Sequence, residues 1–170
     1  MNTNGSRIIQ ELETILRNRT MVIVTLSFDG TRDVHDYVRW PIKWKNYTKT
    51  VRAYKDLQKQ YPLLKLNSWT TVSSLNVENL PNILDFATEQ GLDHDWAFLN
   101  TPDPLNVKYK NKFTIRAKQK LSKSSYTVCR EMSKKIAVAR DNNNLIELFI
   151  KKQDKLRNIN IKNYLNFLPK

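Results

Sequence analysis

Hydroxyl, carboxylate, amide and guanidinium side chains follow three apolar stretches of the sequence that are typical of buried strands. In chain order, these polar side chains belong to Ser27, Asp29, Arg39, Thr71, Ser73 and Asn100. A guanidinium offers a bidentate fork to a carboxylate, and a small hydroxyl is an adaptable hydrogen-bonding group. Ligand sites of α/β proteins collect at the carboxyl ends of parallel strands. The residue types therefore predict recognition of a carboxylate or a ribose, although polar residues also end strands that bind nothing.

An acidic cluster with one histidine follows the first of these stretches. Its members are Asp29, Asp33, His35 and Asp36. Carboxylates and imidazole are ordinary metal ligands, but this spacing matches no closed zinc pattern, and the second histidine, His94, is far away in the sequence. We therefore expect the aspartates to cap helices and form turns, and we predict no metal ligand.

The sequence lacks the motifs of nucleophilic catalysis and of phosphate loops. The single cysteine, Cys129, can form neither an internal disulfide nor a cysteine-rich metal site. No histidine lies near it in sequence, so we expect a buried, inert thiol. Three glycines are too few for a glycine-rich phosphate loop. No catalytic residue is predicted.

Alternating strands and helices must position the polar side chains. Strands are predicted near 21–28, 64–73 and 95–100, and amphipathic helices over 6–18, 44–61 and 76–91. Such alternation indicates βαβ units, and hence an α/β fold with a parallel sheet. The β-branched run 21–28 is typical of a strand covered on both faces. Because no strand is predicted before the first helix, the sheet is expected to begin late.

Basic residues are concentrated towards the C-terminus. Residues 1–107 hold 12 basic and 12 acidic side chains, whereas 108–170 hold 17 basic and 4 acidic, which accounts for the whole net charge of +13. The change follows a turn-rich stretch with two prolines at 100–104. We predict a neutral body over 1–107 and a basic, mostly helical segment over 108–170, with a helix break near 122–127. The apolar residues of 159–168 are expected to pack on the rest of the protein.

Composition restricts the class of protein. With 40% hydrophobic residues, 3 Gly, 6 Pro and 1 Cys, the chain is neither disordered, nor collagen-like, nor a disulfide scaffold. No apolar run reaches the roughly 18 residues of a membrane span, and the polar start lacks a signal-peptide core. We expect a cytoplasmic protein without membrane contact. One functional hypothesis is a non-enzymatic module that binds nucleic acid or another polyanion through its basic segment.

A second hypothesis comes from the run LSFDGTRDVHDYVRWPIKW, residues 26–44. This run resembles the fourth-strand signature of radical S-adenosylmethionine enzymes with a SPASM or twitch C-terminal domain. In that family a Ser, Asp, Gly turn precedes a His, an Asp and an Arg, spaced much as His35, Asp36 and Arg39 are here. Further segments resemble the family in the same order: NTNGS at 2–6, TVSSLNVENLP at 71–81, WAFLNTPDPL at 96–105, and Asp154, Leu156, Arg157, Asn158 and Pro169 near the end. The resemblance spans nearly the whole chain, and 26–44 is its most specific part.

The resemblance implies a partial (β/α)6 barrel, of which this chain is a parallel half-barrel followed by a twitch-like C-terminal segment. Family members bind S-adenosylmethionine and a 4Fe-4S cluster, which generates a 5′-deoxyadenosyl radical that abstracts a hydrogen from the substrate. By resemblance, the cofactor-binding residues are Ser27, Asp29, Arg39, Thr71, Ser73, Leu99 and Asn100. The first three would lie near the methionine carboxylate or the ribose, the next two would line the cavity, and the last two would lie near the adenine.

The family's CxxxCxxC motif, which supplies three thiolates to the cluster, is absent from these 170 residues. We therefore expect the C-terminal half of such an enzyme, beginning at an internal Met: a split-gene subunit, a truncation or a repurposed half-barrel. The cluster is expected only from an N-terminal half encoded nearby, without which the chain would be inactive. An exposed strand edge at 21–28 predicts association with that partner or with a second copy.

Overall fold

The computed structural model describes residues 1–165, and the chain forms two compact units. The first unit comprises 1–70 and 84–96, and the second comprises 71–83 and 97–170. Each unit combines segments that are distant in sequence. The boundaries between the units therefore do not coincide with the change of charge after residue 107. The first unit holds 12 basic and 10 acidic side chains, and the second holds 17 basic and 6 acidic.

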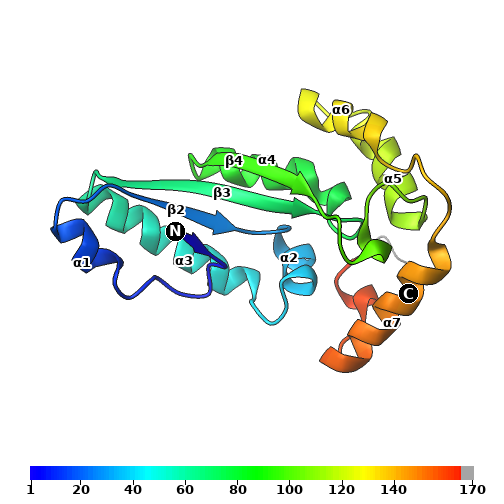
Figure 1. Ribbon diagram of the computed structural model, residues 1–170, viewed down its shortest axis with the longest axis horizontal. Coiled ribbons are helices and arrows are strands. Elements are labelled where there is room, and N and C mark those ends of the chain that lie inside the picture. Colours follow the sequence, from blue (N-terminus) through cyan, green and yellow to red (C-terminus); the bar gives the residue numbers. More distant parts are fainter. Residues whose placement is uncertain (166–170) are drawn as a thin grey trace. The chain divides into compact units, whose positions relative to one another are not determined.

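A four-stranded parallel sheet confirms the predicted α/β fold (Figure 1). Its strands are β1 (Asn2–Thr3), β2 (Val22–Ser27), β3 (Leu64–Val72) and β4 (Asp93–Phe98), in the order β1-β2-β3-β4. β4 begins and ends about two residues before the predicted strand 95–100. Leu99 and Asn100 therefore lie beyond the strand.

The N-terminal part of the chain differs from the sequence-based expectation. A short strand, β1, precedes the first helix and pairs with β2 over two residues. β2 consequently lies between β1 and β3, and it is not the edge strand that 21–28 was predicted to form. Helix α1 (Leu12–Arg17) is shorter than the predicted 6–18. Residues 4–11 form a loop and turn instead, in which the backbone N–H of Ile9 donates to the Tyr54 hydroxyl at 3.1 Å and not to a helical carbonyl.

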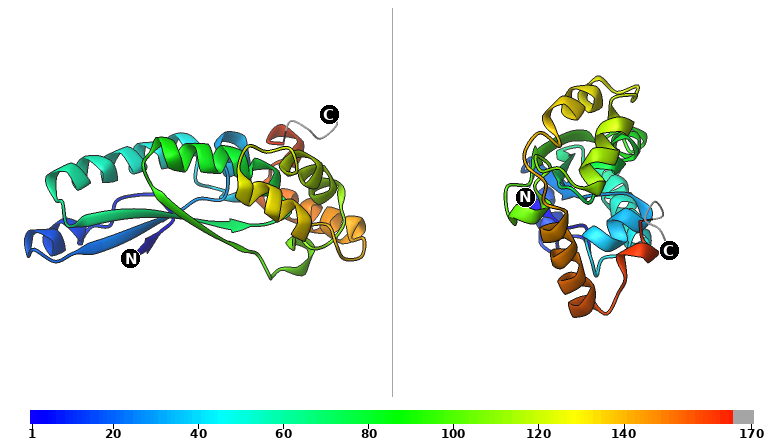
Figure 2. Two further views of the ribbon diagram at one scale, coloured as in Figure 1. Left: turned by 90° about the horizontal axis from the view of Figure 1, so that it is seen from above. Right: turned by 90° about the vertical axis from the view of Figure 1, so that its right-hand side faces the viewer.

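Helices α2 (Arg32–Val38), α3 (Trp44–Gln60) and α4 (Leu80–Glu89) alternate with the strands along the chain. Figure 2 shows α3 and α4 on the same face of the sheet. Phe86 of α4 contacts Phe28 and Trp44, with ring centroids 5.4 Å and 4.7 Å apart respectively. These aromatic contacts attach the end of α4 to α3 and to the end of β2.

The opposite face of the sheet is uncovered in the first unit, contrary to the expectation for 21–28. Along β2 the even-numbered residues are buried, and the odd-numbered residues, which point to the other face, are half-buried or exposed. The same alternation continues along β3, where Lys65, Asn67 and Trp69 are accessible. The sequence does not reveal this alternation, because Ile23 and Thr25 on the open face are β-branched residues, which are also typical of strands buried on both faces.

The second unit is mainly helical, as predicted for the C-terminal segment. Its elements are the 3-10 turns η1 (Val77–Asn79), η2 (Asp103–Leu105) and η3 (Ile161–Asn163), and the helices α5 (Lys112–Leu121), α6 (Thr127–Lys135) and α7 (Asn143–Arg157). α5 packs against η1 and α6, and α7 packs against η2. The break between α5 and α6 falls where the sequence predicts it, near 122–127.

A buried polar network connects several segments of the second unit. Asn111 caps α5 by accepting hydrogen bonds from two backbone N–H groups of its first turn. The Asn111 amide donates to Asn142 Oδ1 at 3.0 Å and to Ser74 Oγ at 3.5 Å, and the Asn142 amide donates to the carbonyl of Pro104 at 3.2 Å. Because these amides are buried and hydrogen-bonded, the network fixes the loops around α5 and α7.

The single cysteine and the apolar residues near the C-terminus belong to the second unit. Cys129 is buried in α6, as predicted. Leu165 is also buried, whereas Phe167 and Leu168, which were expected to pack as well, lie outside the described residues. Among residues 1–165, no helix is long and apolar enough to cross a membrane.

Candidate functional site

A cavity of about 410 Å³ lies on the open face of the sheet, within the first unit. It is lined by Asn2, Thr25, Ser27, Asn67, Ser68, Trp69 and Asp95. Amides, hydroxyls and a carboxylate supply hydrogen-bond donors and acceptors, and the indole supplies a flat apolar surface. This combination suits a polar organic ligand that carries an aromatic ring.

The register of the parallel strands brings four of these side chains together. Thr25 lies opposite Asn67, and Ser27 lies opposite Trp69, across β2 and β3. Because alternate residues of a strand point to the same face, the two pairs form a small array on the open face. Trp69 is 37% exposed, although it lies at the middle of the sheet. Its indole is thus available to a ligand.

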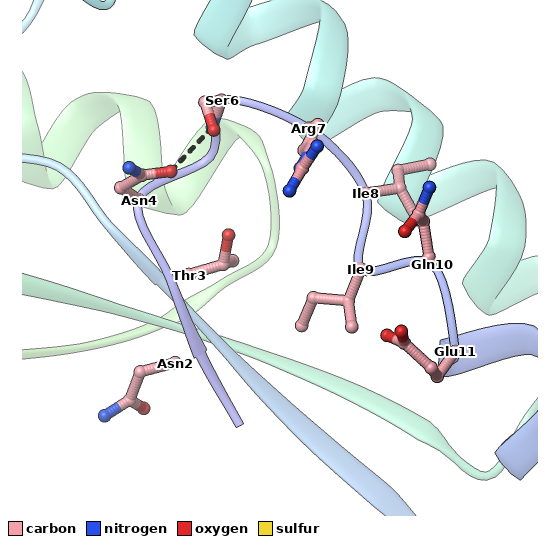
Figure 3. Close-up of a pocket in the computed structure, with 9 residues that line it drawn as sticks. All are labelled: Asn2, Thr3, Asn4, Ser6, Arg7, Ile8, Ile9, Gln10 and Glu11. Atoms are coloured by element: carbon pink, nitrogen blue, oxygen red, sulfur yellow. Dashed lines mark hydrogen bonds between the residues drawn. The ribbon is translucent and has the colours of Figure 1, made fainter.

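A second cavity, of about 480 Å³, adjoins β1. It is lined by residues 2–4 and 6–11, and it shares Asn2 with the cavity on the sheet (Figure 3). Asn4 Oδ1 accepts a hydrogen bond from the backbone N–H of Ser6 at 3.0 Å, and Arg7 lies on the inner side of the loop in Figure 3. The loop therefore adds a guanidinium to the surroundings of the sheet's edge.

Gly5 allows this loop to lie against the first unit's core. A Cβ atom at this position would collide with the ring of Tyr47 on α3, and the positive φ is itself unfavourable for other residues. The loop that carries Arg7 is therefore fixed by a glycine whose role is steric.

Asp29 and Arg39, two of the predicted site residues, bind each other. Arg39 Nε lies 2.7 Å from Asp29 Oδ2, and the two side chains are only 21% and 12% exposed. The ion pair connects the turn after β2 to the C-terminal end of α2. One edge of the Arg39 guanidinium is thus already occupied, which weakens the prediction that Arg39 is the main group for an anionic ligand.

Asp36 has the capping role that the sequence predicts for the aspartates. Asp36 Oδ1 accepts a hydrogen bond from the backbone N–H of Trp44, the first residue of α3, and Asp36 Oδ2 lies 3.4 Å from Lys43 Nζ. A carboxylate at this position also interacts favourably with the helix dipole. Within the described part of the chain, no group of three or more His, Cys, Asp or Glu residues could hold a metal ion.

His35 is buried among aromatic rings and does not face the cavity. Its ring centroid lies 4.9 Å from that of Tyr47 and 5.2 Å from that of Trp44. Burial is the main cause that lowers the pKa of His35 from 6.5 to about 4, and the charge of Arg39 adds to this effect. The imidazole is therefore neutral at pH 7 and part of the core.

His94 lies beneath the cavity. Its Nδ1 is 2.8 Å from Ser68 Oγ, and the Ser68 hydroxyl donates to the backbone carbonyl of Asp93 at 3.1 Å. Burial lowers the pKa of His94, and the nearby carboxylate of Asp95 opposes this effect. This contact could not be predicted from the sequence, because the two residues are 26 positions apart.

The other predicted site residues belong to the second unit. The Ser73 hydroxyl is 3.2 Å from Asn76 Oδ1 and accepts a hydrogen bond from the backbone N–H of Leu75, so it is engaged in a turn. The carbonyl of Thr71 accepts a hydrogen bond from the Asn76 amide. The backbone N–H of Leu99 donates to the carbonyl of Val72 at 2.8 Å, and Asn100 is exposed.

Ser27 is thus the predicted residue that lines the cavity of the first unit. The residues that sequence reasoning missed are Asn2, Thr25, Asn67, Ser68, Trp69 and Asp95. A signal was present in β3, where LKLNSWTTV alternates between buried and accessible positions. An interpretation of the accessible positions of that alternation as a ligand-binding face would have identified Asn67 and Trp69.

Comparisons with known proteins give a likeness in structure and none in sequence. No family model matches the sequence, and no curated protein matches it. Native anSMEcpe with bound AdoMet is similar in structure, with a TM-score of 0.47 and 17% identity over 94% of this chain and 37% of that chain. The forms with AdoMet and the Kp18Cys or Cp18Cys peptide give TM-scores of 0.47 and 0.46, with 16% and 20% identity over 71% of this chain and 34% of those chains. This chain therefore spans about one third of the length of these neighbours, in a loose likeness of architecture.

Proposed function

We propose that the chain supplies an S-adenosylmethionine-binding half-barrel of a radical S-adenosylmethionine enzyme. The cofactor would bind on the open face of the sheet in the first unit. The observation that carries this proposal is the uncovered polar face itself, with its cavity of about 410 Å³. The resemblance of 26–44 to the family's fourth strand supports it, because this segment provides the end of β2 and the turn that follows.

The cavity residues suit the separate parts of the cofactor. An exposed indole such as that of Trp69 stacks with a purine ring. The Asp95 carboxylate and the Asn67 amide are suitable partners for ribose hydroxyls and ring nitrogens. Ser27 at the end of β2, with Arg7 in the adjoining cavity, would bind the methionine carboxylate.

The iron–sulfur cluster does not fit the residues of this chain. Such clusters are held mainly by cysteine thiolates, whereas the sequence has one cysteine, which is buried in α6. We propose that a cluster-bearing segment outside these 170 residues supplies the thiolates and, with them, the radical chemistry. No reaction step is assigned to the present residues, whose role is to bind and orient the cofactor.

Equilibrium dialysis of labelled S-adenosylmethionine against the purified chain tests the proposal. We expect saturable binding that Asn67→Ala weakens about fivefold or more, because a hydrogen bond in the cavity is lost. The matched control is Asn46→Ala, which removes an exposed amide from α3 and should leave binding unchanged. Absence of saturable binding at millimolar cofactor, or equal losses in both variants, would overturn the proposal.

Metal analysis of the same preparation tests the second part of the proposal. The purified chain should be colourless and contain no stoichiometric iron or sulfide. A stoichiometric cluster in the isolated chain would contradict the division of roles between this chain and a cluster-bearing segment.

A further inference from the structure

Two loops that are distant in sequence run side by side in the second unit. The backbone N–H groups of Ala137 and Val138 donate to the carbonyls of Val107 and Lys108, each at 2.9 Å. Further along, the N–H of Lys110 donates to the carbonyl of Arg140 at 3.1 Å. We call residues 107–110 and 137–142 the basic loop pair. Its backbone hydrogen bonds hold the two loops next to each other.

Three exposed cations lie on the basic loop pair. They are Lys108, Lys110 and Arg140, and within residues 1–165 none of them forms an ion pair with a carboxylate. Cations on the neighbouring helices are different, because Lys112 pairs with Glu147 at 3.0 Å and Arg116 with Glu78 at 2.8 Å. The loops therefore carry unneutralised positive charge, whereas part of the helical charge is already compensated.

Two carboxylates lie near these three cations, and one of them belongs to Asp141, a residue that pairs with Lys110 across a backbone bridge. Asp141 accepts hydrogen bonds from the backbone N–H and the side-chain amide of Asn143, at 2.9 Å and 2.7 Å. Asp103 accepts a hydrogen bond from the hydroxyl of Tyr109 at 3.1 Å. Both carboxylates keep their negative charge and offset part of the local positive charge, but among residues 1–165 neither forms an ion pair with the three cations. Cationic groups also flank the loop pair, since Lys135 is exposed at the end of α6 and Lys118 Nζ reaches the carbonyl of Ile136 at 3.4 Å.

We propose that the basic loop pair binds single-stranded nucleic acid through its phosphate groups. Adjacent free cations on a unit with 17 basic and 6 acidic side chains suit a ligand with repeated negative charges. Tyr109 lies between Lys108 and Lys110 in sequence, and its hydroxyl donates a hydrogen bond to Asp103. The position of this ring beside two cations favours a single strand over a duplex, because only a single strand has unpaired bases. A half-buried, fixed aromatic ring offers a stacking surface for an unpaired base.

Fluorescence anisotropy with a labelled 15-nucleotide deoxythymidine strand tests this proposal. The chain should bind the strand at low salt, and the affinity should fall steeply as KCl is raised. The triple variant Lys108→Ala, Lys110→Ala, Arg140→Ala should bind at least about tenfold more weakly. Its slope of log affinity against log salt should be smaller by about 2, since each phosphate contact on a single strand contributes about 0.7. Circular dichroism of this variant should match the parent, because all three side chains are exposed.

A matched control separates this site from general attraction to a basic protein. The variant Lys45→Ala, Lys49→Ala, Arg52→Ala removes the same charge from one exposed side of α3 in the first unit. Its affinity should stay within about twofold of the parent. Equal losses in the two triple variants would overturn the proposal, and so would the absence of binding by the parent chain at low salt.

Discussion

The two compact units use their polar residues in opposite ways. In the first unit, polar side chains of β2 and β3 lie on an open face and line a cavity, while the buried His35 imidazole lies among aromatic rings. In the second unit, the amides of Asn111 and Asn142 are buried and hydrogen-bonded to each other, and many of the accessible polar groups are cations. Polar residues are therefore available for a cofactor in the first unit, whereas in the second they stabilise loops.

The difference has consequences for ligands. The first unit is nearly neutral and offers an aromatic ring with neutral polar groups, which suits a small organic cofactor. The second unit carries a large excess of positive charge, which attracts polyanions and repels a cationic sulfonium compound such as S-adenosylmethionine.

Acid should destabilise the chain through the first unit, with an effect of about 3 kcal/mol. The pKa of His35 is about 4 in the folded chain, against 6.5 as its ordinary value. Above pH 6.5 the imidazole is neutral in both states and the stability is fully present. As the pH falls from 6.5 to 4, the unfolded chain binds a proton that the folded chain does not bind, so the free energy of unfolding falls.

Urea unfolding at several pH values measures this effect. His94 changes in the same direction, because burial lowers its pKa too, so the parent is compared with His35→Phe, which keeps an aromatic ring at this buried position. Between pH 7 and pH 4, the free energy of unfolding of the parent should fall by about 3 kcal/mol relative to that of His35→Phe. A constant difference would show that His35 is not the neutral core residue inferred from its burial.

Asn111→Ala should destabilise the chain by about 2 kcal/mol, independently of pH between 5 and 8. The substitution removes a helix cap and leaves the buried amide of Asn142 with one partner fewer. Urea unfolding of Asn111→Ala and of Asn67→Ala compares a buried amide of the second unit with an accessible amide of the first. Equal effects of the two substitutions would contradict the contrast between the units.

Tyr109→Ala should weaken binding of the deoxythymidine strand about fivefold, because a stacked base contributes on the order of 1 kcal/mol. Tyr109→Phe keeps the ring and should bind nearly as well as the parent. Anisotropy titrations at one salt concentration make this comparison. Equal losses for Phe and Ala would show that the hydroxyl, and not the ring, is what matters.

Asn67→Ala should have the smallest effect on stability, within about 0.5 kcal/mol, because its side chain is accessible on the open face. The same substitution should weaken S-adenosylmethionine binding about fivefold. Thermal unfolding with and without the cofactor measures both properties in one preparation. A large loss of stability in the absence of cofactor would mean that Asn67 is a structural residue.

The positions of β2, β3 and β4 and their parallel arrangement could be predicted from the sequence, because hydrophobic periodicity and turn residues act locally. The open face could not, since Ile23 and Thr25 are β-branched residues that suit either face of a strand. The cavity was found only in part for the same reason: Ser27 follows from its position at a strand end, whereas Asn2 and Asp95 reach the cavity through sheet order. The Asp29–Arg39 ion pair likewise depends on how α2 folds back after the turn at Gly30.

Nuclear magnetic resonance of the 15N-labelled chain, titrated with S-adenosylmethionine, tests the central claim most directly. The proposal predicts saturable shifts of the Trp69 indole N–H and of the Asn67 side-chain amide, with the signals of Lys108, Lys110 and Arg140 unchanged. Shifts confined to the basic loop pair, or no saturable shift on the open face of the sheet, would contradict the claim that the first unit binds this cofactor.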